Sequence, residues 1–459
     1  MFRSIFNTFA NCFKIPELKS RILFTFGMLA VCRLMAFIVI PGMDGEGLSA
    51  YFAKNQGFGG MVGMYNTFAG GAFGNCAIGA LGIMPYISAT IILQLMTAVI
   101  PSLSKLAREE GGRTKIIQLG RYLTVLICII QGGYFAFSYL HPQNIFSGFQ
   151  GQLVLIDNVY FYYIFTVAIM TTGTMLLMWI GEQITDRGIG NGVSLVITIG
   201  ILARLPVALQ GVKDMFFGPT HTNSLLGVGL LLLILLVIVI GGVIAVTQAQ
   251  RKIPVQYASR MVGQKMYQGG TNYMPLRVNY SGVMPIIFAS SILMIPQPVF
   301  SWIALNVKQP FVHDWVQWLA IETAYGSIFY IMIYGLMILF FSYFWVATQF
   351  NEIQIADDLK KNGGYIPGVR PGQQTSEYLH KAMSRITLAG AIFLTIIATV
   401  PIELANELHI PQSVASFFGG TSILISVGVL LDTMRQVEAH LMMRHYDGFL
   451  KKGRMRGRF

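Results

Sequence analysis

The chain carries very little charge. Only 11% of its 459 residues are Asp, Glu, Lys or Arg, whereas a soluble protein has about 25%. Hydrophobic residues make up 54% of the chain. They form recurrent runs of about 20 residues, the length that crosses a hydrocarbon core as a helix. This composition excludes a soluble protein and predicts an all-α polytopic membrane protein, because a β-barrel would show short alternating strands instead.

Signatures of catalysis and of cofactor binding are also missing. Cys12, Cys32, Cys76 and Cys128 form no CxxC pair, so we interpret them as small buried hydrophobes. The sequence contains no HExxH zinc motif and no GxxxxGK[ST] phosphate loop. The glycine run 188–192 lacks a preceding strand, which favours the start of a helix over a nucleotide site. We therefore expect no catalytic residue, metal site or cofactor, and an energy source that lies in another protein or in a gradient.

Ionisable residues are almost absent from the apolar runs. Arg33 is the main exception, and we expect it to pair with backbone or with a neighbouring helix. Asp432 falls near the cytoplasmic end of the last run. Transporters usually mark their pathway with such residues. An inverted-repeat secondary transporter is therefore the disfavoured alternative. An intramembrane enzyme is a second alternative, and it would need a nucleophile with a base or a metal motif.

The apolar runs predict ten spans. The second and seventh contain Pro85 and Pro285, which should interrupt the helical hydrogen bonds and let these helices bend. Neighbouring helices would then have to satisfy the freed carbonyls. The spans are expected near 21–40, 79–100, 117–139, 159–180, 190–208, 224–247, 281–300, 326–348, 384–402 and 418–440.

Basic residues lie on one side of this arrangement. The loops after odd-numbered spans hold only Lys54, Lys213 and Lys308 among their basic residues, and the other side carries most of the 32 lysines and arginines. Basic loops stay cytoplasmic, so both termini should be cytoplasmic. The net charge of +12 then mostly reflects membrane topology.

The expected spans suggest four parts. They are an amphipathic segment 1–20, a first half 21–210 with spans one to five, a second half 211–440 with spans six to ten, and a basic cytoplasmic tail 441–459. Segment 1–20 should lie on the membrane surface, with a disordered tail as the alternative.

Two cytoplasmic loops, 248–280 and 349–383, exceed the typical connection of about 4–6 residues. In the later loop, Gly368-Val-Arg370-Pro-Gly372 should form a turn that holds Arg370 in place for a partner.

Two motifs recur half a chain apart. Gly82-Ile-Met-Pro-Tyr-Ile87 matches Gly282-Val-Met-Pro-Ile-Ile287, and Gly192-Val-Ser-Leu-Val-Ile197 matches Gly420-Thr-Ser-Ile-Leu-Ile425. The same order in each half predicts two pseudo-symmetric five-helix halves related as an inverted repeat, with a path where equivalent helices meet. Ile83 and Ile87 share a helix face, as do Val193 and Ile197. With Ile287 and Ile425 they could form an apolar constriction, and lipid-facing or packed isoleucines are the alternative.

The stretch Thr67–Cys76 precedes the second span on the exterior side. It is apolar, yet its glycines disfavour a firm helix. We expect it to fold inward and to move easily, with an ordinary re-entrant loop as the alternative.

The chain resembles the SecY family, the central channel subunits of the bacterial protein translocon, over essentially its whole length. The motifs that carry the resemblance are Gly82–Thr90, Gly181–Gly192, Ile253–Ala258, Gly282–Ser291, Pro367–Gly372 and Gly419–Ile425. The resemblance implies two halves around an hourglass channel in the bacterial inner membrane. Such a passive channel passes unfolded secretory proteins and releases hydrophobic segments sideways into lipid.

The resemblance also implies roles for particular residues. A ring at the waist comprises Ile83, Ile87, Val193, Ile197, Ile287 and Ile425; a plug spans 66–76 and includes Phe68, Gly70, Gly71, Phe73 and Gly74. A lateral gate between the second and seventh spans involves Pro85, Ser88, Asn279 and Pro285; partner docking involves Arg260, Lys265 and Arg370. Val193 replaces a frequent isoleucine and should widen the waist slightly. Gln264 stands where the family often has a second basic residue, which should weaken docking there.

The implied partners are small membrane subunits like SecE and SecG, the SecA motor ATPase, and the ribosome. Signal sequences, unfolded preproteins and membrane lipids complete the set.

Overall fold

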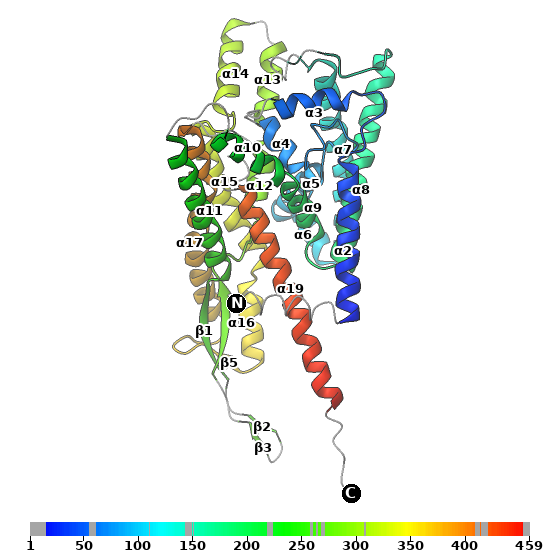
Figure 1. Ribbon diagram of the computed structural model, residues 1–459. Coiled ribbons are helices and arrows are strands. Elements are labelled where there is room, and N and C mark those ends of the chain that lie inside the picture. The colour runs from blue at the N-terminus through cyan, green and yellow to red at the C-terminus, as the bar shows by residue number, and fades with distance from the viewer. Residues whose placement is uncertain are drawn as a thin grey trace. The chain divides into compact units, whose positions relative to one another are not determined.

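The computed structural model describes residues 15–54, 61–109, 111–142, 149, 151–217, 224–257, 260–262, 265–267, 271–306, 309–408, 414 and 421–452. The chain is mostly helical, with two small sheets (Figure 1). It divides into two compact units: residues 1–221, 411–417 and 429–459 form the first, and residues 222–410 and 418–428 form the second. Most of the expected amphipathic segment 1–20 lies outside the described residues.

In the first unit, α8 packs against α2, α7 and α9, while α5 packs against α7. Its helices are α2 (Pro16–Met35), α3 (Gly45–Lys54), α4 (Met61–Phe68), α5 (Met84–Val99), α6 (Pro101–Arg108), α7 (Gly112–Leu140), α8 (Val159–Arg187), α9 (Gly192–Leu202) and α10 (Leu205–Phe217). Helix α19 (Thr421–Lys452) begins in the second unit and continues in the first.

In the second unit, α15 packs against α12 and α17, and α17 also packs against α11. Its helices are α11 (Ser224–Gln248), α12 (Met284–Leu293), α13 (Pro296–Asn306), α14 (Pro310–Glu322), α15 (Ile328–Gln349), α16 (Glu352–Lys361) and α17 (Gln373–Glu407). Its strands are β1 (Gln250–Tyr257), β2 (Arg260–Val262), β3 (Lys265–Tyr267), β4 (Thr271–Arg277) and β5 (Gly364–Tyr365).

Each of the ten expected spans coincides with a helix or a helix pair. Among the described residues six helices are long and apolar enough to cross a membrane, and α5 with α6 makes a seventh if the pair is one span bent by 105°. Large side chains exposed along these helices, such as Ile130, Leu336 and Ile396, suit contact with lipid. The prediction of a multi-pass helical membrane protein is confirmed.

The two repeated prolines do not bend their helices, and that expectation was wrong. Pro85 and Pro285 stand in the first turn of α5 and α12. The first backbone N–H groups of a helix have no partner inside the helix, so proline there removes no hydrogen bond. These prolines start the helices and leave no freed carbonyl to be satisfied.

The glycine three residues before each of these prolines also takes the same conformation in both motifs. Gly82 has φ +59° and Gly282 has φ +63°, a region that residues with a Cβ rarely adopt. The next residues, Ile83 and Val283, have nearly equal backbone angles. The two motifs are therefore alike in local structure as well as in sequence. The second pair cannot be compared in full, because Gly420 lies outside the described residues.

The two long loops of the second unit fold together. Strand β1 pairs with β4 from the same loop and with β5 from the later loop, giving the order β4-β1-β5 next to α16 (Figure 1). Ile253 and Val255 of β1 are buried with Ile366 and Leu379 in one apolar cluster. These strands were not expected from the sequence. Their pairing joins the two loops through one sheet.

Candidate functional site

The segment predicted to be the plug, residues 66–76 and hereafter called the plug segment, is mostly buried inside the first unit. Helix α4 ends at Phe68, and the chain then runs through successive turns to the start of α5. Phe68, Phe73 and Cys76 are all buried. The end of the segment is tied to the chain after α2, because the Ile40 N–H donates to the Cys76 carbonyl oxygen and the Ile78 N–H to that of Ile38.

Aromatic packing holds the middle of the plug segment. The ring of Phe73 lies 4.9 Å from that of Phe135, 5.3 Å from Tyr139 and 5.8 Å from Tyr65, measured between centroids. The Tyr139 hydroxyl donates to the Phe73 carbonyl oxygen at 3.0 Å, and the Tyr65 hydroxyl to that of Leu81 at 2.8 Å. Aromatic pairs of this kind contribute about 0.5–1.5 kcal/mol each beyond burial.

Asn66 holds the glycine-rich turns in place, a role that was not expected from the sequence. Its side-chain oxygen accepts from the Gly74 N–H at 2.9 Å, and its carbonyl accepts from the Gly71 N–H at 2.8 Å. Gly70 and Gly71 both have positive φ. Asn66 stands in the last turns of α4, four residues before Gly70, and its contacts with the turns appear only in the folded chain.

Two arginines approach the same turn. Arg33, on α2, donates from Nη1 to the Gly70 carbonyl oxygen at 2.6 Å and stacks over the Phe37 ring at 5.0 Å. The expected pairing of Arg33 with backbone is confirmed. Arg204, which follows α9, lies against Gly71. No role for Arg204 was expected from the sequence, because only the tertiary fold brings it to the plug segment.

The space between the plug segment and the helices is small. A cavity of about 30 Å³ is lined by residues including Phe68, Ala69, Ile83, Val196 and Gly200. A water needs roughly 10–15 Å³ measured in this way. The segment therefore nearly fills the space beside Ile83.

The predicted ring residues divide between the units. In the first unit Ile83, Ile87 and Ile197 are buried and Val193 is half-buried. Ile83 and Val193 lie against the same residue: a Cβ built on Gly181 would be 3.6 Å from Ile83 Cδ1 and 3.4 Å from Val193 Cγ2. Ile287 and Ile425 are buried in the second unit. The complete ring stays a prediction.

The predicted gate residues also belong to different units. Pro85 and Ser88 lie on α5 in the first unit, while Asn279 and Pro285 lie at and before α12 in the second. Asn279 is buried and accepts from the Ser281 hydroxyl at 3.3 Å. The gate itself stays a prediction.

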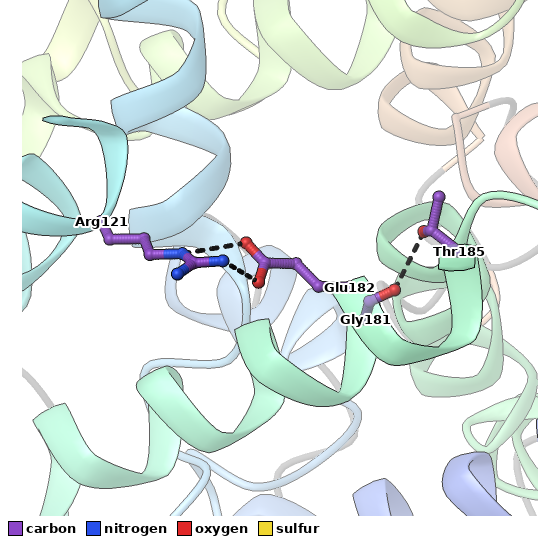
Figure 2. Close-up of polar contacts among 4 residues, drawn as sticks. All are labelled: Arg121, Gly181, Glu182 and Thr185. Atoms are coloured by element: carbon purple, nitrogen blue, oxygen red, sulfur yellow. Dashed lines mark hydrogen bonds and ion pairs between the residues drawn. The ribbon is translucent and has the colours of Figure 1, made fainter. Parts of the chain in front are cut away.

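The Gly181–Gly192 motif forms a rigid bend between α8 and α9. The Thr185 hydroxyl donates to the Gly181 carbonyl oxygen and accepts from the Gly192 N–H, both at 2.9 Å (Figure 2 shows the first bond). A Cβ on Gly192 would lie 1.9 Å from the Gly181 oxygen, so only glycine fits. Asn191 caps α9 through the Ser194 N–H. The expected helix start at this glycine run is confirmed.

The same motif joins α8 to α7. Arg121 and Glu182 form a two-pronged ion pair, with Nη2 2.7 Å from Oε2 and Nε 3.4 Å from Oε1 (Figure 2). Bidentate geometry fixes direction as well as distance. Together with the bend, it positions Val193 at the start of α9.

Arg370 is exposed on a tight turn in the second unit. The Val369 N–H donates to the Ile366 carbonyl oxygen at 3.0 Å, and the Thr375 hydroxyl donates to that of Arg370 at 2.9 Å. Ile366 is anchored in the apolar cluster below the sheet. The backbone under Arg370 is thus held at both ends. Arg260 and Lys265 lie on the separate hairpin β2–β3, which pairs Val262 with Lys265.

Comparison with known proteins covers nearly the whole chain. The sequence profile of the SecY family matches residues 77–434. The chain belongs to the SecY family. A protein translocase subunit SecY of Chlamydia muridarum is 42% identical over 462 residues, covering 98% of this chain and 99% of that protein.

Solved structures share the SecY fold. A protein-conducting channel aligns with a TM-score of 0.59 at 17% identity, covering 95% of this chain and 94% of the other. Sec61 in a canine ribosome–channel complex from the endoplasmic reticulum aligns with a TM-score of 0.56 at 16% identity over the same shares. The multi-pass helical architecture is therefore that of the SecY family.

Proposed function

We propose that this chain is the channel subunit of a protein translocase. Unfolded secretory chains cross through it, and hydrophobic segments leave it sideways into lipid. The observation that carries the proposal is the burial of segment 66–76, in turns rather than in a long helix, among the helices of the first unit. A removable seal of this kind suits a pore that must admit a polypeptide and otherwise stay closed.

The buried side chains support a passive pore over a transporter or an enzyme. Among the described residues, the buried polar side chains are those of Ser, Thr, Asn and Tyr, and no Asp, Glu, Lys, Arg or His is buried. Ion-coupled transport uses ionisable groups at the membrane midplane. A ring of branched apolar side chains instead offers a passing chain no hydrogen-bonding group, and it resists ion flow by dewetting.

Opening can be driven by the substrate itself. A signal sequence buries apolar area against gate helices and lipid, and this burial contributes a favourable free energy of roughly 25 cal/mol per Å². A closed state within a few kcal/mol of the open state can be shifted by such a ligand. No chemical step is needed in the channel subunit.

We place the chain in the bacterial inner membrane with both termini cytoplasmic, as the basic loops favour. The sheet β4-β1-β5 and the Arg370 turn would then face the cytoplasm, where exposed Arg251, Lys252 and Lys360 add positive charge. This surface suits a ribosome, as in the canine Sec61 complex, or a motor ATPase of the SecA kind. Single-span subunits like SecE and SecG would complete the assembly.

Reconstitution tests the function directly. The chain, purified with its small subunits, is placed in liposomes with a SecA-type ATPase and an unfolded secretory precursor. We expect the precursor to become protease-protected only with ATP, and a precursor held folded by an internal crosslink to stay outside. Ion-driven uptake of a small solute without precursor protection would instead support the transporter alternative.

Arg370→Glu should slow precursor transport at least about tenfold, because the substitution replaces the cation of a directional, charge-assisted contact by an anion. Transport rate is measured in the same liposomes, and channel amount by quantitative blot. Arg385→Glu, an exposed change on α17, is the matched control. A normal rate for Arg370→Glu would exclude the docking role.

A further inference from the structure

Two cations converge on the Gly70–Gly71 turn of the plug segment from different parts of the chain. Arg33 reaches it from α2, and Arg204 reaches it from the residue pair that follows α9. Gly70 and Gly71 are adjacent, so the two guanidinium groups hold one turn. They also repel each other electrostatically.

We propose that Arg33 and Arg204 are positioning residues that hold the plug segment in its resting place and so set how readily the channel opens. This inference rests on the proposed channel function. It assigns the pair a role in gating that goes beyond the fold and the apolar ring.

Arg33 provides the stronger contact. Its Nη1 lies 2.6 Å from the Gly70 carbonyl oxygen, a short distance typical of a charge-assisted hydrogen bond. The ring of Phe37 covers the other side of the guanidinium. Because the site is half-buried and apolar, the bond is stronger than its equivalent in water.

Arg204 lies against the neighbouring Gly71. A Cβ built on Gly71 would be 3.6 Å from both Cζ and Nε of Arg204. Nε is buried, and no partner for it lies within the part of the chain that the structure describes. The Gly71 backbone lies against this cation. Removing the turn would leave Arg33 without its carbonyl acceptor and Arg204 without this neighbouring backbone, which favours the closed arrangement.

The glycines are what make the close approach possible. A Cβ on Gly70 would lie 2.9 Å from Arg33 Nη1 and 2.9 Å from the Gly200 Cα, in a backbone region with φ +64°. A Cβ on Gly200 would in turn be 3.2 Å from the Phe68 carbonyl oxygen. The turn is thus held between α2 and the end of α9, with close contacts on both sides.

The first experiment measures the position of the plug segment and the seal together. Cys76 is the native reporter in a channel whose other three cysteines are replaced. Burial raises the pKa of the Cys76 thiol to about 12, so the reactive thiolate is scarce while the segment is in place. The readouts are the rate of Cys76 labelling by a membrane-permeant maleimide and the resting conductance in planar bilayers.

We expect Arg33→Gln to raise the labelling rate and the resting conductance at least about tenfold, since a charged donor is replaced by a weaker neutral one. Arg204→Gln should act in the same direction, and Arg33→Lys should restore most of the seal. Arg435→Gln, which removes an arginine paired with Asp432 on α19, is the control and should change neither readout. Unchanged labelling and conductance in the Arg33/Arg204 double variant would overturn the proposal.

The second experiment tests whether the arginines limit ion flow through the plug segment or by themselves. In a channel with residues 66–76 replaced by a Gly-Ser linker, Arg33→Gln should add no further leak. An equal added leak in that background would also overturn the proposal. Gly70→Ala displaces the same contact from the other side and should reproduce the Arg33→Gln leak. Precursor transport by the wild-type channel, measured in parallel, distinguishes failure of the proposed role of Arg33 and Arg204 from failure of the channel function.

Discussion

Replacing Ile87 and Ile197 together with asparagine is expected to raise resting ion conductance by at least about tenfold, because polar side chains wet an apolar constriction. Both residues are buried in the first unit, on α5 and α9. Conductance of the resting channel is measured in planar bilayers, without precursor or ATPase. Glycine at both positions should also raise the leak, by widening the ring.

The same helices supply a matched control. Ile91 and Ile201 lie one helical turn, about 6 Å, from the two ring residues. Their side chains are equally buried, at 1% and 0% exposure against 3% for Ile87 and 1% for Ile197. Asparagine at Ile91 and Ile201 therefore introduces the same polarity at another depth. Equal leaks from the two double variants would mean that general loss of packing, not the ring, explains the effect.

Joining α5 to α12 by a disulfide is expected to abolish insertion of signal anchors, and reduction should restore it. The sideways exit is predicted between these helices, which carry the two repeated proline motifs. Cysteine at Ser88 is combined with cysteine at Ser290 or Ser291, which lie near Phe288 on α12. Phe288 itself packs against Phe341 and Trp345 and is kept. The four native cysteines are removed first.

The measurement is the fraction of a signal-anchor protein that resists alkaline extraction, with and without reductant. Each single-cysteine channel is the control for oxidation alone and should insert normally. A crosslinked channel that inserts anchors at the uncrosslinked rate would place the exit elsewhere.

The sequence predicted the membrane-spanning helices well because that signal is local. A run such as Leu225–Val246 must be a helix where it meets lipid, since a helix is the conformation in which a single segment satisfies its own backbone hydrogen bonds. Loop charge predicts the orientation in the same local way. Neither inference depends on which helices touch.

The prolines show where local reasoning failed. A proline inside an apolar run suggests a bend, yet Pro85 and Pro285 open their helices. Whether a proline bends a helix or begins one depends on where the first helical turn starts, and here the turn starts just after Gly82 and Gly282, which have positive φ. The glycine three residues before each proline is the feature of the sequence that indicates this start.

The sequence by itself determined the spans, the glycine-rich segment before the second span and the exposed turn at Arg370, because composition and short-range turn chemistry encode them. Only the tertiary structure decided which groups meet across long separations. Arg33 binds Gly70 thirty-seven positions away, and β1 pairs with β5 from a loop about a hundred positions later. Such contacts follow from how whole helices pack, and a backbone carbonyl or strand edge carries no side-chain identity by which the sequence could name its partner.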